Sequence, residues 1–171
     1  PIGQGVAVTP IQLAVMAAVI ANGGLRVQPH VVDRIQTADG RVVRSAEVAE
    51  PVRVLNPETA TTVQQMLRSV VESGTGQLAN VQGLTVAGKT GTAQKIEPTG
   101  RYSHSRFVAS FVGFGPVPDS RFVIVVNVDE PRPAYFGGVV AAPIFKRIVE
   151  QLASYWGLER RPAAPVIARL P

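Results

Sequence analysis

The sequence predicts an α+β fold built around an incomplete antiparallel sheet of three main strands, 84–94, 107–115 and 121–129, flanked by helices. The two later strands are strong candidates because FVASFVGFG and RFVIVVNVD are rich in β-branched and aromatic residues. Residues 115–120 between them (GPVPDS) have turn chemistry, so these strands should be antiparallel neighbours. Both strands are apolar on both faces, which predicts helices over each face of the sheet.

The first expected element is a helix at 10–21. Thr9 and Pro10 are residue types preferred at an N-cap and at a first helical position. Almost every residue from 11 to 21 is apolar, and the Asn-Gly-Gly sequence at 22–24 ends the helix. A helix that is apolar all round belongs inside a protein, so other segments should cover it.

A small hairpin is expected at 31–44. Short β-branched runs flank the Thr-Ala-Asp-Gly sequence at 37–40, and Asp-Gly between such runs is a hairpin signal. The charged residues on these runs favour a peripheral flap over a place in the core.

The second helix is expected at 57–73, with Asn56 as its N-cap, Pro57 at its first position and Glu58 in its first turn. Its apolar stripe is predicted to face the core and consists of Ala60, Val63, Met66, Leu67, Val70 and Val71.

The last helix is expected at 139–156, with Pro143 near its first turns and Gly157 at its end. Its apolar positions are Ile144, Ile148, Leu152 and Tyr155, with Phe145, Val149 and Trp156 beside them. Residues 158–171 contain three prolines and are predicted to form an extended tail, so the domain portion is assigned to 1–157.

The composition is that of a globular domain, with 171 residues, 46% apolar and 17% charged. The net charge is +5, but the basic residues are scattered along the chain and form no stripe interleaved with aromatic residues. No nucleic-acid partner is therefore expected. There is no cysteine, and His30 and His104 have no ligand-spaced neighbours, so neither a metal nor a cofactor is expected. No apolar run reaches the roughly 18 residues that cross a bilayer, and the abrupt start at Pro1 suggests a fragment.

Two motifs overlap at 83–94. Residues 83–90 match the phosphate-loop pattern G-x-x-x-x-G-K-[ST], and 122–130 resemble the apolar strand and acid that hold magnesium in nucleotide-binding domains. This motif needs a strand before Gly83 and a helix beginning at Lys89. Residues 77–82 lack strand character, and 91–100 contain two glycines and a proline without a helical apolar period, so nucleotide binding is disfavoured.

The second motif is Lys89-Thr90-Gly91, the Lys-Thr-Gly box of serine acyl-transferases that bind penicillin, which lies on a strand. On a strand, the backbone N–H groups of Thr90 and Thr92 leave by the same edge and can serve one cleft. Gly91 would let a substrate backbone lie close to that edge, and Lys89 would add positive charge where a carboxylate or a developing charge sits. The plain alternative is an exposed strand lysine in a tripeptide that arose by chance.

Several further stretches occur in a fixed order around this box. They are IGQGVAVTPIQL at 2–13, ANGG at 21–24, VESGTG at 71–76, AGKTGTAQK at 87–95, FVGF at 111–114, YFGG at 135–138 and APIF at 142–145. Together they resemble the C-terminal half of the transpeptidase domain of class B penicillin-binding proteins, of the division and elongation type, over residues 2–156.

The resemblance implies a serine D,D-transpeptidase that cross-links peptidoglycan stem peptides at D-alanyl-D-alanine and is a target of β-lactams. It implies a place in the bacterial cell envelope, on the extracytoplasmic side of the cytoplasmic membrane. Lys89 resembles the lysine of the proton network, Thr90 the residue that binds the terminal carboxylate, Gly91 the close-approach position and Thr92 the donor of an oxyanion N–H. Tyr135 and Phe136 resemble an aromatic wall at the cleft mouth, with ordinary loop packing as the alternative.

Two boxes of this family are absent from the 171 residues. None of the eight serines has Lys three residues later or Asn two residues later, so neither S-x-x-K, with its nucleophile, nor S-x-N is present. Without a nucleophile there is no acyl-enzyme, so the chain alone is expected to be inactive. The expected partners are the missing N-terminal half of the domain, which would cover the helix at 10–21, and cell-division or elongation proteins. A non-catalytic penicillin-binding sensor or scaffold of the same fold is the alternative function.

Overall fold

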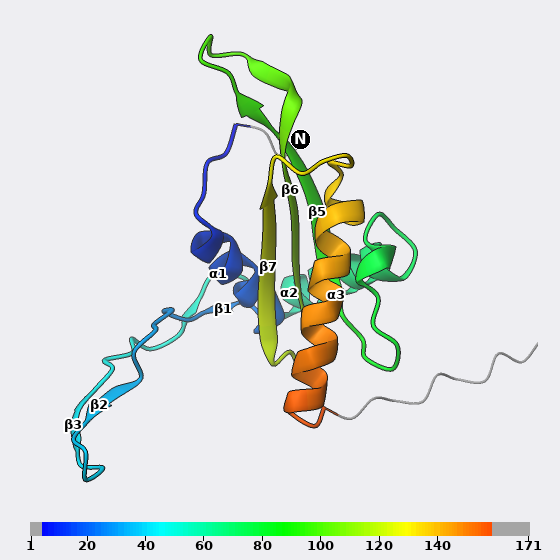
Figure 1. The fold of residues 1–171 in the computed structure, drawn as a ribbon. Helices are drawn as coiled ribbons and strands as arrows, with labels where there is room; N and C mark the ends of the chain where they lie inside the picture. Colours follow the sequence, from blue (N-terminus) through cyan, green and yellow to red (C-terminus); the bar gives the residue numbers. More distant parts are fainter. Residues whose placement is uncertain (1–4, 159–171) are drawn as a thin grey trace, which may run out of the picture.

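The computed structural model describes residues 5–158. Its centre is an antiparallel sheet in the order β5–β6–β7, formed by β5 (Ala87–Ile96), β6 (Tyr102–Gly115) and β7 (Phe122–Asp129). Figure 1 shows the three strands side by side, with α3 (Gly137–Tyr155) running along them. The predicted α+β fold with three main antiparallel strands is therefore confirmed.

Helices cover both faces of this sheet, as the apolar strands predicted. Phe111 of β6 packs on Phe145 of α3, with ring centroids 4.8 Å apart. The next residue, Val112, packs in a separate cluster with Ala17 of α1 (Pro10–Ala21). Because successive strand residues point to opposite faces, α3 and α1 lie on opposite sides of the sheet. The second helix, α2 (Pro57–Glu72), packs mainly on β5.

The larger core lies between the sheet and α3, where Phe111, Phe145 and Val149 are fully buried. Space for these rings comes from a pair of facing glycines, Gly88 on β5 and Gly113 on β6. A Cβ on Gly88 would stand 2.6 Å from the Phe111 ring, and one on Gly113 would stand 2.7 Å from the Phe145 ring. The strand that carries Lys-Thr-Gly is thus fixed to α3 through two aromatic rings.

The first two helices begin as the sequence predicted. Thr9 and Gln12 form a reciprocal capping box at the start of α1, and the Asn56 side chain accepts a hydrogen bond from the Thr59 N–H at the start of α2. One predicted core position is wrong, because Met66 on α2 is 62% exposed. The buried residues of α2 are Ala60 and Val71, as predicted, and Gln64, whose side-chain amide donates a hydrogen bond to the Ile20 carbonyl at the end of α1.

The last helix begins two residues earlier than expected, at Gly137, and its buried stripe is displaced from the predicted one. The buried residues are Gly137, Ala141, Ala142, Phe145, Val149 and Ala153. Ile144 and Tyr155, which were predicted to face the core, are exposed. Small alanines let the helix axis approach the sheet, so the larger side chains at 144 and 155 are turned away from it.

The strand boundaries require a correction. The expected strands 84–94 and 107–115 left residues 95–106 outside the sheet, but β5 continues to Ile96 and β6 begins at Tyr102, so only 97–101 turn. Periodicity in apolar residues could not reveal this extension, because ion pairs hold it. At the other end, β5 begins at Ala87 and not at 84; Leu84 makes an isolated bridge with Val81.

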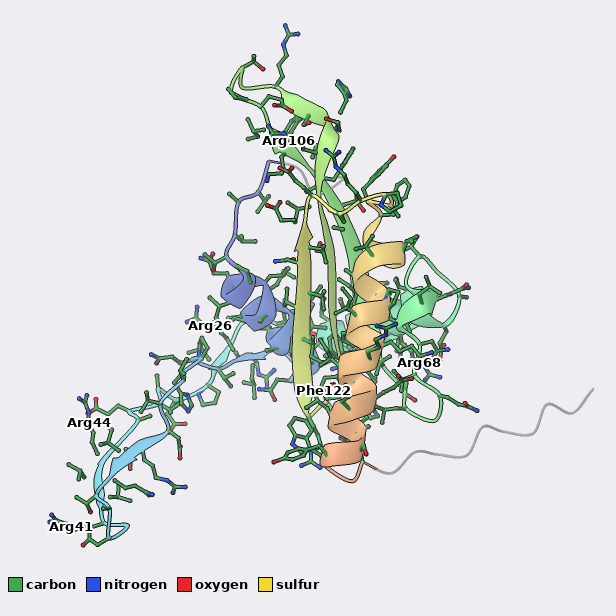
Figure 2. The ribbon with its side chains drawn as sticks, in the orientation of Figure 1. Arg26, Arg41, Arg44, Arg68, Arg106 and Phe122 are labelled. Carbon is green, nitrogen blue, oxygen red and sulfur yellow. The ribbon has the colours of Figure 1, made fainter. Side chains whose placement is uncertain are left out.

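The expected peripheral hairpin is present as β2 (Arg34–Gln36) and β3 (Val42–Ser45). It projects from the body in Figure 1, and Arg41 and Arg44 lie on it in Figure 2. Two further short strands at its base, β1 (Leu25–Arg26) and β4 (Val52–Arg53), were not predicted. A 3-10 turn, η1 (Gln77–Ala79), precedes the main sheet.

The predicted extended tail falls almost entirely at 159–171, outside the described residues. Within the described part of the chain, no helix has both the length and the hydropathy needed to cross a membrane.

Candidate active site

Lys89, Thr90, Gly91 and Thr92 lie in the first half of β5 and continue an extended backbone from the buried Ala87 and Gly88. No helix begins at Lys89, and the segment before Gly83 is the 3-10 turn η1 and a short bridge in place of a strand. The phosphate-loop interpretation requires both elements, so the structure rules it out.

One edge of β5 is free, because β5 pairs only with β6 among the described residues. The carbonyl of Thr90 accepts a hydrogen bond from Lys89 Nζ at 3.0 Å, which requires that carbonyl to be accessible. The Gly91 carbonyl oxygen differs: together with the Ser110 carbonyl oxygen of β6, it lies next to Gly137, where β5 and β6 pair. Since N–H and C=O of one strand residue share an edge, Thr90 and Thr92 face the free edge and Gly91 faces β6.

A cavity of about 350 Å³ borders this part of β5. Three segments from different parts of the sequence meet there: the loop after α2, the Lys-Thr-Gly strand and the start of α3. The Thr75 and Thr90 hydroxyls are 2.9 Å apart, and the Gly137 N–H donates to Thr92 Oγ1 at 3.0 Å. The lining residues are Gly74, Thr75, Gln77, Leu78, Thr90, Thr92, Phe136, Gly137, Gly138 and Val139.

Two glycines allow these segments to approach so closely. A Cβ on Gly137 would lie 2.2 Å from the Gly91 carbonyl oxygen, and a Cβ on Gly138 would lie 2.4 Å from the Thr75 carbonyl oxygen. Neither distance is possible for any other residue type without displacing backbone. The glycine pair therefore determines where the first turn of α3 rests on β5.

Lys89 presents a cation at the free edge. Its Nζ bonds only the Thr90 carbonyl and, at 3.5 Å, the Thr90 hydroxyl, and no carboxylate in the described part of the chain pairs with it. An exposed ammonium without a carboxylate partner can attract an anionic group to this edge. Gly91 lies on the same face, where its missing Cβ leaves room for the Ser110 hydroxyl.

The two aromatic candidates occupy different positions. Phe136 lines the cavity and is 56% exposed. Tyr135 does not line it; its ring stacks on Phe107 of β6 at a centroid distance of 4.2 Å, and its centroid lies 4.5 Å from that of Phe136. The pair therefore forms a continuous aromatic surface from β6 to the edge of the cavity.

Charged side chains join the outer ends of all three strands. Lys95 on β5 pairs with Asp129 and Glu130 at 3.0 and 2.7 Å, and Arg106 on β6 pairs with Glu97 at 2.6 Å. Figure 2 shows Arg106 at the end of the sheet next to the β5–β6 turn. The hydrogen bonds that Lys95 donates to Glu130, and then to Asp129, raise the pKa of Lys95, while the hydrogen bond donated by Arg106 lowers the pKa of Glu97.

Sequence reasoning missed three residues of this arrangement, Thr75, Gly137 and Gly138. All three lie in stretches that resemble the family, VESGTG and YFGG, yet only the fold brings them to β5. A glycine doublet before a helix was the available signal, because it marks a close backbone approach. Among residues 5–158 there is no cluster of His, Asp or Glu suited to a metal ion.

A helix-flanked antiparallel sheet with Lys-Thr-Gly on its cleft-side edge defines the class of penicillin-binding serine acyl-transferases. The family model described as "Penicillin binding protein transpeptidase domain" matches residues 1–150. The chain belongs to this family.

Relatives support the same assignment. Penicillin-binding protein PbpB of Mycolicibacterium smegmatis is 42% identical over 89% of this chain, and stage V sporulation protein D of Bacillus subtilis is 38% identical over 93% of it. The chain spans only 25% of the length of each. A crystal structure of penicillin-binding protein 3 of Mycobacterium tuberculosis with ampicillin superposes with a TM-score of 0.86, at 36% identity, covering 96% of this chain and 38% of that one.

Proposed function

We propose that this chain forms the Lys-Thr-Gly side of the active site of a serine D,D-transpeptidase that cross-links peptidoglycan stem peptides ending in D-alanyl-D-alanine and is acylated by β-lactams. The observation that carries the proposal is the free edge of β5, where Thr90 and Thr92 border a cavity and Lys89 has no carboxylate partner among the described residues. An extended peptide can lie along such an edge.

This geometry supports the roles that we propose for the site residues. The Thr90 hydroxyl, 2.9 Å from that of Thr75, binds the terminal carboxylate of the stem peptide or of the β-lactam. The Thr92 N–H faces the free edge and serves as one oxyanion donor, while Gly137 holds the Thr92 side chain from the other side. Lys89 supports the proton network, Gly91 permits close approach, and Phe136 with Tyr135 provides the aromatic wall.

The nucleophile must come from another segment of the polypeptide, because no serine of the chain is followed by Lys at the third position. Residues 1–157 then constitute the C-terminal portion of one transpeptidase domain, and a segment carrying S-x-x-K and S-x-N completes the cleft. The chain alone neither acylates nor turns over substrate, because an oxyanion donor without a nucleophile leaves only residual catalysis.

The whole protein acts, in this proposal, at the extracytoplasmic side of the bacterial cytoplasmic membrane, next to its peptidoglycan substrate. Its partners are the remaining half of the domain and proteins of division or elongation; it uses neither a cofactor nor nucleic acid. Transpeptidation transfers an acyl group from an amide to an amine. Positioned side chains and backbone donors suffice for this reaction, because it has no redox step and requires no metal ion.

Labelling with a fluorescent penicillin tests the proposal. The complete protein should be labelled covalently and the 171-residue chain should not. Thr90→Val should slow labelling of the complete protein by about 10- to 100-fold, because one charge-assisted hydrogen bond to the carboxylate is lost. Thr99→Val, at the exposed turn between β5 and β6, is the matched control and should label normally.

Labelling of the isolated chain would show that a nucleophile lies within it and would contradict the proposal. Labelling of the complete protein without cross-linking of stem peptides would instead favour a sensor or scaffold.

A further inference from the structure

Glu130 is the only non-glycine residue of the described chain with a positive φ, at +47°. This left-handed conformation is unfavourable for a residue with a Cβ, so surrounding contacts must maintain it. One contact is made by the backbone, because the Glu130 N–H donates to the Phe107 carbonyl at 2.9 Å. The chain therefore leaves β7 in a sharp turn, directed by its last bond to β6.

The Glu130 carboxylate is held by cations from both other strands. Its Oε1 lies 2.7 Å from Lys95 Nζ of β5 and 3.7 Å from Arg106 of β6. Lys95 also pairs with Asp129, and Arg106 with Glu97, so each cation is itself fixed by a second carboxylate. Such a network constrains geometry more than an isolated surface ion pair does.

The turn at Glu130 leads into the segment that carries the aromatic pair. Five residues later, Tyr135 stacks on the ring of Phe107, the same residue whose carbonyl accepts the Glu130 N–H. Phe136 then lies against Tyr135 and lines the cavity. The path from the Lys-Thr-Gly strand to the aromatic surface thus runs through Lys95, Glu130 and Phe107.

We propose that Glu130 is a positioning residue: its turn and its carboxylate hold residues 131–136 so that Tyr135 stays stacked on Phe107 and Phe136 lines the cavity. The position of Phe136 in turn sets how well the site accepts ligands with a large acyl side chain. The claim about ligands with a large acyl side chain rests on the proposed function. The claim that Glu130 positions the two rings does not, and a structure can test it directly.

The experiment uses the complete protein with Glu130→Ala, which removes the carboxylate, and Glu72→Ala as the matched control. Glu72 also pairs with an arginine at 2.7 Å, but on the exposed face of α2, and it does not line the cavity. A crystal structure of Glu130→Ala should show the 131–136 segment displaced and the Tyr135–Phe107 stack lost. Glu72→Ala should leave both in place.

Acylation rates provide the second readout, with ampicillin, whose side chain is aromatic, and 6-aminopenicillanic acid, which has no acyl side chain. Glu130→Ala should slow acylation by ampicillin about tenfold, because a group that binds the side chain is displaced. It should slow acylation by 6-aminopenicillanic acid less than about threefold. Glu130→Asp, which keeps a carboxylate at this position, should lose less of the ampicillin acylation rate than Glu130→Ala. A general effect on folding would slow acylation by both β-lactams equally.

Retention of the Tyr135–Phe107 stack in Glu130→Ala, or equal slowing of both β-lactams, would overturn the inference. If Glu130→Ala does not fold, Glu130→Gly removes the carboxylate without conformational strain and must give the same displacement. If the unsubstituted protein reacts with neither β-lactam, the proposed function fails, and the ring positions still decide whether Glu130 holds the loop.

Discussion

The two faces of the main sheet differ in how completely this chain covers them. On the α3 side, Phe111, Phe145 and Val149 are fully buried between sheet and helix. On the α1 side, Ile11 and Met16 remain 55% and 51% exposed, although α1 is apolar all round. The α3 side is thus a finished core within the chain, whereas the α1 side has apolar surface that another segment can cover. The free edge of β5 lies at the boundary between them.

The largest effect is expected from a substitution on the α3 side of the sheet, where the core is complete. Phe145→Ala removes a fully buried ring that touches Phe111 and fills the space left by Gly113, so it should destabilise the chain by about 3–5 kcal/mol. Ile144→Ala, one residue earlier and 40% exposed, should cost less than about 1 kcal/mol. Denaturant unfolding of both variants measures the difference. Equal losses would mean that α3 is not the completed side.

A smaller effect is expected from the open face, and it should depend on the length of the protein. Met16→Ser should change the stability of the 171-residue chain by less than about 0.5 kcal/mol, because the side chain already meets water. In the complete protein the same change should cost about 2 kcal/mol, because the proposed second half of the domain buries this methionine. The same small change in both proteins would show that no segment covers α1.

These contrasts also show what the sequence could reveal. Caps, turn residues and β-branched runs are local signals, so α1, the start of α2, the β2–β3 hairpin and the three strands were predicted from them. The strand residues 95–96 and 102–106 were missed because charges paired between strands, such as Lys95 with Glu130, leave no apolar period in the sequence. Met66 was misplaced because a helical stripe shows which residues share a face but not how far a partner extends over it.

For the site, the sequence predicted the strand that bears Lys89 to Thr92 but not its surroundings. The neighbours of Thr90 and Thr92 come from 15 and 45 positions away, Thr75 before them and Gly137 after. Only the tertiary fold brings such residues together, so a family resemblance could point to the stretches but not to the contacts.

The smallest effect concerns pH and compares the centre of the sheet with its outer end. The lowered pKa of Glu97 means that its ion pair stabilises the fold above the ordinary Glu pKa of about 4.3 and is lost as the pH falls through the lower folded value. The raised pKa of Lys95 acts at the other extreme: its contribution is complete below its ordinary pKa and is lost only as the pH rises through the higher folded value.

Hydrogen exchange should therefore show the amides of 95–106 losing protection in acid before those of 107–115. Glu97→Gln should remove most of this pH dependence, whereas Glu47→Gln in the exposed segment after β3 should not alter it. Loss of protection at the same pH in both segments would contradict a separate role for the outer ion pairs.

The most direct test of the account is a crystal structure of the complete protein acylated by ampicillin. The account predicts that the ligand lies along the free edge of β5, with its carboxylate within about 3 Å of the Thr90 hydroxyl and its acyl oxygen at a similar distance from the Thr92 N–H. A ligand bound to a serine of these 171 residues, or one placed away from β5 with Thr90 and Thr92 making no contact, would contradict it.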